Sequence, residues 1–486
     1  MYTIKLFLAS SIVEFENERL KLKAFESQLN DIYEDRDIRF KIIICENISN
    51  AFSSERKQDE YNKEIRESQY FYIIFGSRAG QYTIEEFNVA FTAFQEKGFP
   101  KIYTYFQKLP GGIKPEESVL QFRKHIEQDM QHYTSEFTDI DTIKLNMLVE
   151  LALDSRLNGD LSLEDGQAHL RGIAVMSLEQ IQIYKKNETI TKLQEEKKNL
   201  ENEYVKLISN SRDDSLNNKL IENSKAREEI SKQLHELEKE ILNLFEFAAK
   251  NRRLDKSINW REREAIKKID EGNYDAAKKV LEDPEWEKEV QFAEEKIGEN
   301  KKEIIEYISG QRLLIQAIKS HTYDAKKTNT EIEPIYEKIC HLAGKYQIEL
   351  DTYYDYAFYL YNSRGDYKKA FNIIRRLQSY LSNDIKTVPM SKIIKIGLLW
   401  ADCNSQLHDY ETAEKAYRAA IKLCEGRKAT EPQNRCIYQR YEARAKYSLS
   451  ALLSKKNKPH RSSKPGDRCN YIILRFGKAI PFRILI

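Results

Sequence analysis

The first third of the chain contains four short apolar runs separated by segments with a helical pattern of hydrophobic residues. The runs are rich in β-branched and aromatic residues, as expected for strands that are buried on both faces of a sheet. Strands that alternate with helices predict a parallel sheet covered by helices on both sides, and therefore an α/β domain over residues 1–156. The predicted strands are Ile4 to Ala9, Phe40 to Cys45, Tyr70 to Gly76 and Lys101 to Phe106.

The carboxyl ends of these strands are where a ligand is expected, because open α/β sheets bind their ligands beyond that edge. The side chains predicted to surround this mouth are Ser10, Ser11, Glu46, Asn47 and those of the loop after Gly76. Hydrophobic spacing after the first strand predicts an amphipathic helix. Its expected buried face contains Val13, Leu20, Ala24 and Leu29.

The next two segments carry different local signals. Asp165-Gly166 between alternating residues predicts a β-hairpin, which we assign to an appendage over residues 157–178. Neither glycine nor proline occurs between Gly172 and Gly272, which favours long helices. Hydrophobic residues at heptad-like spacing then predict a helical connector over residues 179–252. Two helices folded back on each other fit this pattern best, and an intermolecular coiled coil is the alternative.

Residues 253–455 are predicted to form an α-solenoid, because one motif recurs along them. Tyrosines at positions 274, 323, 367 and 410 recur at intervals of 49, 44 and 43 residues, and in three of the four motifs an alanine follows three residues later. The motifs resemble tetratricopeptide repeats, in which Gly365, Tyr367 and Ala370 match the consensus turn and second helix. These residues are interpreted as packing residues, so that function is expected on the concave surface of the array. The basic segment 456–486 has no helical period and is interpreted as an atypical tail in which the final repeats are missing or replaced.

The composition of the chain mainly argues against certain partners. The 486 residues carry a formal net charge of only +2, so nothing in the overall charge calls for nucleic acid as a partner. No apolar run is long enough to cross a bilayer, and the six scattered cysteines lack metal-ligand spacing. We therefore expect free thiols, no metal, no membrane and a cytoplasmic location.

Three segments of the α/β region resemble a known family. "IKLFLASS", "KEIRESQYFYIIFG" and "GQYTIEEFNVAF" are similar to the Toll/interleukin-1 receptor (TIR) domain, whose sheet is flavodoxin-like. "ASSIVEFENER" also resembles a related TIR-like family that begins with a Ser-Ser and a Glu-Arg pair. The resemblance covers about the first third of the chain, and its motifs are short.

The resemblance implies an activity and a set of residues. Enzymatic TIR domains cleave the nicotinamide–ribose bond of NAD⁺, which would here be the substrate, with no cofactor. Their catalytic glutamate, four residues after an aromatic residue, falls on Glu86 and that aromatic residue on Tyr82, where the family has tryptophan. Thr83 replaces a frequent cysteine. Substrate contacts would come from Ser10 and Ser11, and also from Glu46 and Asn47 in a loop that often completes the site of a neighbouring subunit.

Glu86 also has an interpretation without catalysis. Thr83-Ile84-Glu85-Glu86 reads as a capping box, in which a threonine and a glutamate satisfy the first amides of a helix. The position beyond the third strand favours catalysis instead. The sequence thus predicts an NAD⁺-cleaving effector of antiviral defence, which self-associates through its TIR-like domain and whose repeats bind an unknown trigger. The alternative is a TIR-like adaptor or scaffold without enzymatic activity.

Overall fold

The computed structural model describes residues 2–44, 57–130, 132–154, 156–157, 160–209, 216–252, 259–295, 301–321, 325–381, 388–431 and 434–456. The chain divides into two compact units, Met1–Asp324 and Ala325–Ile486. This division falls inside the segment that the sequence assigns to helical repeats.

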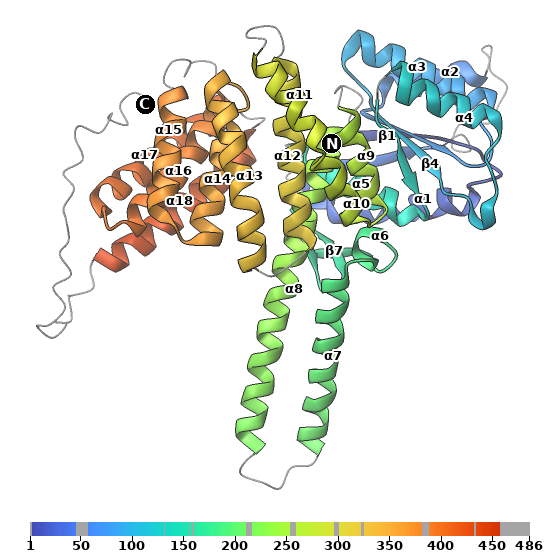
Figure 1. Ribbon diagram of the computed structural model, residues 1–486. Coiled ribbons are helices and arrows are strands. Elements are labelled where there is room, and N and C mark those ends of the chain that lie inside the picture. Colours follow the sequence, from blue (N-terminus) through green and yellow to red (C-terminus); the bar gives the residue numbers. More distant parts are fainter. Residues whose placement is uncertain are drawn as a thin grey trace, which may run out of the picture. The chain divides into compact units, whose positions relative to one another are not determined.

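A parallel sheet forms the centre of the α/β domain in the first unit, as predicted (Figure 1). Its strand order is β2-β1-β3-β4-β5, which is flavodoxin-like. Adjacent strands are all parallel, and Ser10 at the end of β1 is in register with Ile74 of β3. The carboxyl ends of β1 and β3 are therefore neighbours. The strands are β1 (Tyr2–Ser10), β2 (Ile38–Ile43), β3 (Tyr70–Phe75), β4 (Lys101–Gln107) and β5 (Ser135–Phe137), the last of which is too short to be evident in the sequence.

Helices cover both faces of this sheet (Figure 1). One face packs against α2, α3 and α4 through a core that includes Phe71, Phe87 and Phe122. Helices α1 and α5 contact each other on the other face. The helices of this domain are α1 (Glu16–Ile32), α2 (Lys57–Glu67), α3 (Gln81–Lys97), α4 (Glu117–Lys124) and α5 (Ile140–Ala152), with short turns η1 (Glu34–Arg36), η3 (Pro110–Gly112) and η4 (His125–Asp129).

The buried face of α1 differs from the predicted one. Val13 and Leu20 are 78% and 63% exposed, whereas Arg19 is only 2% exposed. The helix buries Arg19, Leu22, Phe25, Leu29 and Ile32. The prediction was wrong in phase because a charged residue occupies one position of the buried stripe, and a hydrophobic pattern cannot register it.

The predicted hairpin exists and belongs to a three-stranded antiparallel sheet, β6 (Leu161–Glu164), β7 (Gln167–Leu170) and β8 (Ile173–Ser177). Asp165 and Gly166 both have positive φ, 49° and 76°, as a tight two-residue hairpin turn requires. Arg171 fixes this sheet to the α/β domain, because it donates to the carbonyl of Ile32 at 2.6 Å and pairs with Asp35. The short helix α6 (Gln182–Lys185) follows.

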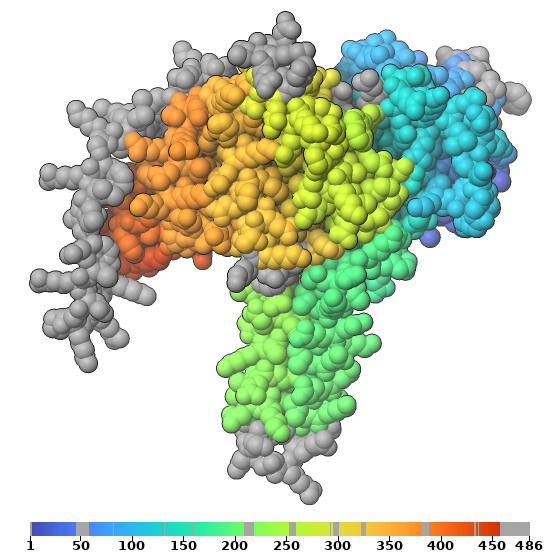
Figure 2. Space-filling view, in the orientation of Figure 1, coloured from blue at the N-terminus to red at the C-terminus, as the bar shows by residue number. Residues whose placement is uncertain are grey.

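The connector forms a helical hairpin, the first of the two predicted arrangements. Helices α7 (Glu188–Ser209) and α8 (Leu216–Arg252) pack against each other, and Arg227 lies over the ring of Tyr204 at 4.1 Å. The far part of this hairpin projects away from the α/β domain (Figure 2). At its other end, Glu238 of α8 accepts hydrogen bonds from the amides of Asp165 and Gly166 at 3.1 and 2.8 Å. The connector is thereby built into the first unit.

Four further helices complete the first unit: α9 (Trp260–Asp270), α10 (Tyr274–Leu281), α11 (Pro284–Glu295) and α12 (Lys301–His321). Helix α9 contacts β5, the edge strand of the parallel sheet. There Asp270 accepts a hydrogen bond from the Tyr133 hydroxyl at 2.7 Å, and Arg263 donates to the carbonyl of Glu127 at 2.6 Å. The α/β domain and the first helical repeat therefore form one packed body.

The second unit is a stack of consecutive helices: α13 (Ala325–Tyr346), α14 (Asp351–Tyr359) continued by η5 (Leu360–Arg364), α15 (Tyr367–Leu381), α16 (Met390–Gln406), α17 (Tyr410–Thr430) and α18 (Arg435–Lys456). Each helix packs against the next one along the chain. This agrees with the predicted stacking of helix pairs.

The repeated motif marks helix starts in both units. Tyr274, Tyr367 and Tyr410 are the first residues of α10, α15 and α17, and Tyr323 lies outside the described residues. An Asn or Asp side chain caps each start, with the amides of Ala276, Lys369 and Thr412 as donors. The alanines Ala277, Ala370 and Ala413 are fully buried, as their predicted packing role requires.

None of the helices in the described part of the chain combines the length and the hydrophobicity that crossing a bilayer requires.

Candidate functional site

The end of β3 and the end of β1 are joined by a carboxylate that the sequence analysis did not single out. Glu14 accepts hydrogen bonds from the amide and the hydroxyl of Ser77, at 2.8 and 2.5 Å. A side chain at Gly76 would be 2.9 Å from the same carboxylate, so the lack of a Cβ at this position permits the contact. The loop after β3 is therefore held against the loop after β1, as the predicted mouth requires.

Helix α3 starts three residues earlier than the capping-box interpretation requires. Its N-cap is Gly80 in an extended conformation, and no side chain caps it. The amide of Ile84 donates to the carbonyl of Gly80 at 3.2 Å, so Thr83 is already inside the first turn. The capping-box interpretation of Glu86 is wrong, because Glu86 follows the N-cap by six positions and lies beyond the free amides of the helix start.

Glu86 instead points into the protein. It is 4% exposed, and burial raises the pKa of its carboxyl to about 7, against an ordinary value of 4.5. A hydrogen bond from Gln58 of α2 and the positive charge of Arg19 oppose this shift in pKa, whereas the neighbouring charge of Glu85 adds to it. A buried carboxyl with a pKa near neutrality is a frequent property of catalytic acids and bases.

Arg19 connects Glu86 to the end of β1. The guanidinium is buried and donates to the carbonyl of Ser10 at 3.3 Å. Its charge also acts on Glu86, which comes from a helix on the opposite face of the sheet. The sequence signal for Arg19 was its place in the Ser-Ser and Glu-Arg motif and not its hydrophobicity. No sequence signal identified Gln58, because its contact with Glu86 depends on how α2 and α3 pack together.

Four of the six residues predicted for this site lie in the part of the chain that the structure describes. Ser10 is 6% exposed, and its hydroxyl has no hydrogen-bond partner among the described residues. The Ser11 hydroxyl accepts a hydrogen bond from the amide of Glu14 at 3.4 Å, which gives Ser11 a role in the local turn. Tyr82 is 64% exposed and lies one helical turn before Glu86. Glu46 and Asn47 lie outside the described residues.

This arrangement has three chemical capabilities. Glu86 can stabilise a developing positive charge once its carboxyl is ionised, and Arg19 favours that ionised form. The Ser10 hydroxyl, which has no partner among the described residues, can bond a ligand once neighbouring residues move, because it is buried. The exposed ring of Tyr82 offers an apolar face at the edge of the site. Among the described residues, no group of three His, Cys, Asp or Glu side chains is arranged to hold a metal ion.

The fold defines a class of protein: a flavodoxin-like α/β domain followed by a long region of stacked helices. Comparisons with protein-family models, with curated proteins and with solved structures give no match to this chain.

Proposed function

We propose that the α/β domain cleaves the nicotinamide–ribose bond of NAD⁺ and that Glu86 is its catalytic carboxylate. The observation that carries this proposal is that Glu86 is buried, interacts with Arg19 at the end of β1, and is not explained as a helix cap. Ligands of open parallel sheets bind at this edge. The resemblance of the surrounding motifs to TIR domains supplies the reaction.

The chemistry requires little more than one carboxylate. Nicotinamide leaves as a neutral molecule from a cationic precursor, so its departure needs no general acid. Positive charge develops on the ribose, as in glycoside cleavage, and an ionised carboxylate next to it lowers the barrier. In this proposal Arg19 keeps a fraction of Glu86 ionised at neutral pH, Tyr82 contacts the nicotinamide or ribose, and Ser10 binds a sugar hydroxyl or phosphate.

The helical regions are proposed to control this activity in the cytoplasm. The repeats would bind a trigger and bring several α/β domains together, which raises their local concentration to about millimolar. The segment that contains Glu46 and Asn47 would then contribute to the site of a neighbouring chain, as the TIR resemblance implies. Antiviral defence is the setting in which such arrangements operate.

Replacement of Glu86 by glutamine tests the catalytic role. Glu86→Gln keeps the size of the side chain and removes its charge, so NAD⁺ consumption by the purified full chain, with forced clustering, should fall by about 10²-fold or more. Glu85→Gln is the matched control, because Glu85 is adjacent, only half-buried, and accepts a hydrogen bond from Asn62 at 3.2 Å. Equal activity of wild type and Glu86→Gln would refute the catalytic role.

The low exposure of Glu86 favours a second candidate function. A carboxyl that is 4% exposed is not accessible to a substrate unless neighbouring residues move. In this alternative the α/β domain is a non-enzymatic adaptor, and Glu86 is a buried structural residue that Gln58 satisfies. Absence of NAD⁺ consumption by the clustered wild-type chain would favour the adaptor.

A further inference from the structure

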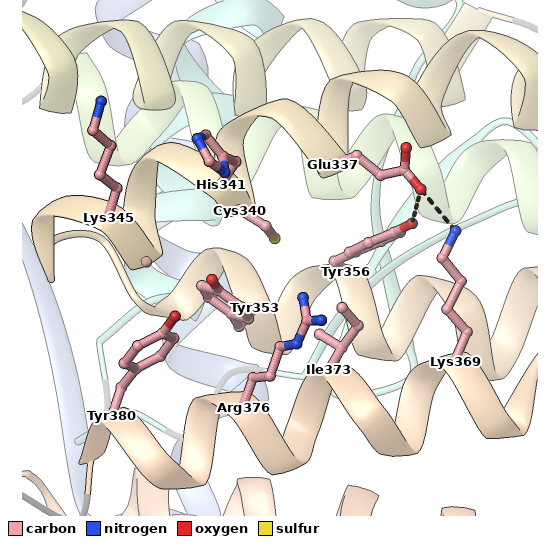
Figure 3. Close-up of a pocket in the computed structure, with 11 residues that line it drawn as sticks. Glu337, Cys340, His341, Lys345, Tyr353, Tyr356, Lys369, Ile373, Arg376 and Tyr380 are labelled. Carbon is pink, nitrogen blue, oxygen red and sulfur yellow. Dashed lines mark hydrogen bonds and ion pairs between the residues drawn. The ribbon is translucent and has the colours of Figure 1, made fainter. Parts of the chain in front are cut away.

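The second unit contains a pocket of about 530 Å³ between α13, α14 and α15 (Figure 3). This size is in the range of sites for small molecules and cofactors. Because all of its lining residues belong to these three helices, the pocket is complete within the second unit. They are Glu337, Cys340, His341, Gly344 and Lys345 of α13, Tyr353 and Tyr356 of α14, and Lys369, Ile373, Arg376 and Tyr380 of α15.

One end of the pocket carries a network that is internally satisfied. Lys369 donates to Glu337 at 2.8 Å, and the Tyr356 hydroxyl donates to the same carboxylate at 3.4 Å (Figure 3). Lys369 also donates to Glu333 at 2.5 Å. The positive charge of Lys369 is thereby neutralised by two carboxylates. This end offers carboxylate oxygens and a tyrosine ring, which suit the N–H groups and the flat face of an aromatic ligand.

The rest of the pocket is cationic. Arg376 is exposed, points from α15 into the space between the helices, and has no carboxylate partner among the described residues (Figure 3). His341 and Lys345 line the pocket from α13, and the Lys345 ammonium lies 5.1 Å from the ring of Tyr346. A guanidinium without a protein carboxylate is a strong site for a phosphate, because its planar donors match two phosphate oxygens.

Two tyrosines line the pocket beyond Arg376, on the side away from Glu337 and Lys369 (Figure 3). The rings of Tyr353 and Tyr380 are 5.4 Å apart and meet edge to face. Both hydroxyls converge on Gly344, where an added Cβ would be 2.2 Å from Tyr353 and 2.7 Å from Tyr380. The lack of a Cβ at Gly344 thus leaves room for these two hydroxyls, which any other side chain would displace.

We propose that this pocket binds a phosphorylated aromatic small molecule of mononucleotide size. Arg376 would hold the phosphate with His341 contributing from α13, and Tyr356, next to Glu337, would contact the ring. Glu337 would accept hydrogen bonds from the edge of the base. The pocket would be the place where the helical unit detects its ligand, and it is independent of the NAD⁺-cleaving activity proposed for the first unit.

Calorimetric titration of the full chain tests this proposal, with AMP, UMP, adenosine and inorganic phosphate as probes. We expect saturable binding of at least one of the two mononucleotides, and binding at least tenfold weaker for adenosine and for phosphate. Arg376→Ala should weaken binding of that mononucleotide at least tenfold, and His341→Ala severalfold. Arg375→Ala is the matched control, since Arg375 is equally exposed on the same helix but does not line the pocket.

Three results would overturn the proposal. The first is that neither mononucleotide binds, and the second is that phosphate binds as tightly as the mononucleotides. The third is that Arg376→Ala and Arg375→Ala bind alike, which would place any binding elsewhere, including in the α/β domain. Both arginines are exposed, so the variants should fold, and equal thermal unfolding would verify it. The readout is binding and not NAD⁺ consumption, so the result does not depend on the function proposed for Glu86.

Discussion

Two buried carboxyls, one in each unit of the chain, have opposite environments. Asp402 of α16 is 7% exposed, accepts the Tyr417 hydroxyl at 2.6 Å and pairs with Arg444 at 2.5 Å. Glu86 of α3 is as deeply buried, but a hydrogen bond from Gln58 and the charge of Arg19 do not compensate its burial, and its pKa rises to about 7. In the helical stack, Asp402 has a hydroxyl and a guanidinium as direct partners. In the α/β domain, the pKa of Glu86 is about 7, so its carboxyl is partly protonated and partly ionised at neutral pH. This difference separates a structural group from a candidate catalytic one.

The comparison predicts that loss of Asp402 is the most damaging change to stability. Asp402→Ala removes one partner of a buried ion pair and leaves Arg444 and the Tyr417 hydroxyl without it. We expect the second unit to lose about 3 kcal/mol or more of unfolding free energy, measured by urea denaturation. As a control, Glu411→Ala removes an exposed pair with Lys415 on α17 and should leave the unfolding free energy nearly unchanged. A similar small loss for both variants would show that Asp402 is not structural.

Glu86 should show the opposite behaviour, because its burial raises the pKa of the carboxyl. Between the ordinary pKa of 4.5 and the native pKa of about 7, the folded state binds more protons than the unfolded state. Stability then falls as the pH rises through this range. Glu86→Gln should therefore be more stable than wild type by about 2–3 kcal/mol at pH 8 and equally stable at pH 4, in urea denaturation at both values. A loss of stability at pH 8 would indicate that ionised Glu86 supports the fold.

The same pKa sets the expected pH dependence of catalysis. If Glu86 acts as a carboxylate, NAD⁺ consumption should rise about tenfold between pH 6 and pH 8, with a midpoint near the pKa of about 7. The initial rate of NAD⁺ consumption at substrate concentrations well below KM measures this profile, because kcat/KM reports the pKa of the free enzyme. Activity that falls over the same range would mean that the protonated form is the active one and that the proposed role is wrong.

The smallest expected effect concerns a feature that the two units share. Asn273 caps α10 in the first unit and Asp409 caps α17 in the second. In each case the side-chain oxygen accepts a hydrogen bond from the amide three residues later. Asn273→Ala and Asp409→Ala should each lower the unfolding free energy by about 1 kcal/mol, because the cap acts locally. Thermal unfolding of both variants checks this. A much larger loss in one unit would show that its cap also supports contacts between helices.

Much of the architecture was predictable from the sequence because it depends on local preferences. The strands and their parallel direction follow from apolar runs that alternate with helical segments. The hairpin follows from Asp165-Gly166, whose positive φ values few other residue pairs adopt. The starts of α10, α15 and α17 follow from an Asn or Asp that precedes each tyrosine. Each of these signals acts within a few residues of the chain.

The buried polar residues could not be predicted in the same way. Thr83 and Glu86 have the spacing of a capping box, but the helix begins at Gln81 and Glu86 is inside it. A helical pattern of apolar residues placed Leu20 in the interior of the protein, whereas α1 buries Arg19 instead. The pocket of the second unit also escaped the sequence analysis, although tyrosines at 353, 354, 356, 359 and 361 are an unusual concentration.

The sequence by itself determined which segments become strands and helices and where several of them begin. Only the tertiary structure decided that Arg19 reaches the end of β1 and that Gln58 of one helix contacts Glu86 of another. It also decided that Arg376 points into a pocket shared with α13 and α14. Backbone conformation is set by interactions within a turn or two of the chain, whereas the burial and pKa of a polar side chain depend on neighbours that only packing brings together.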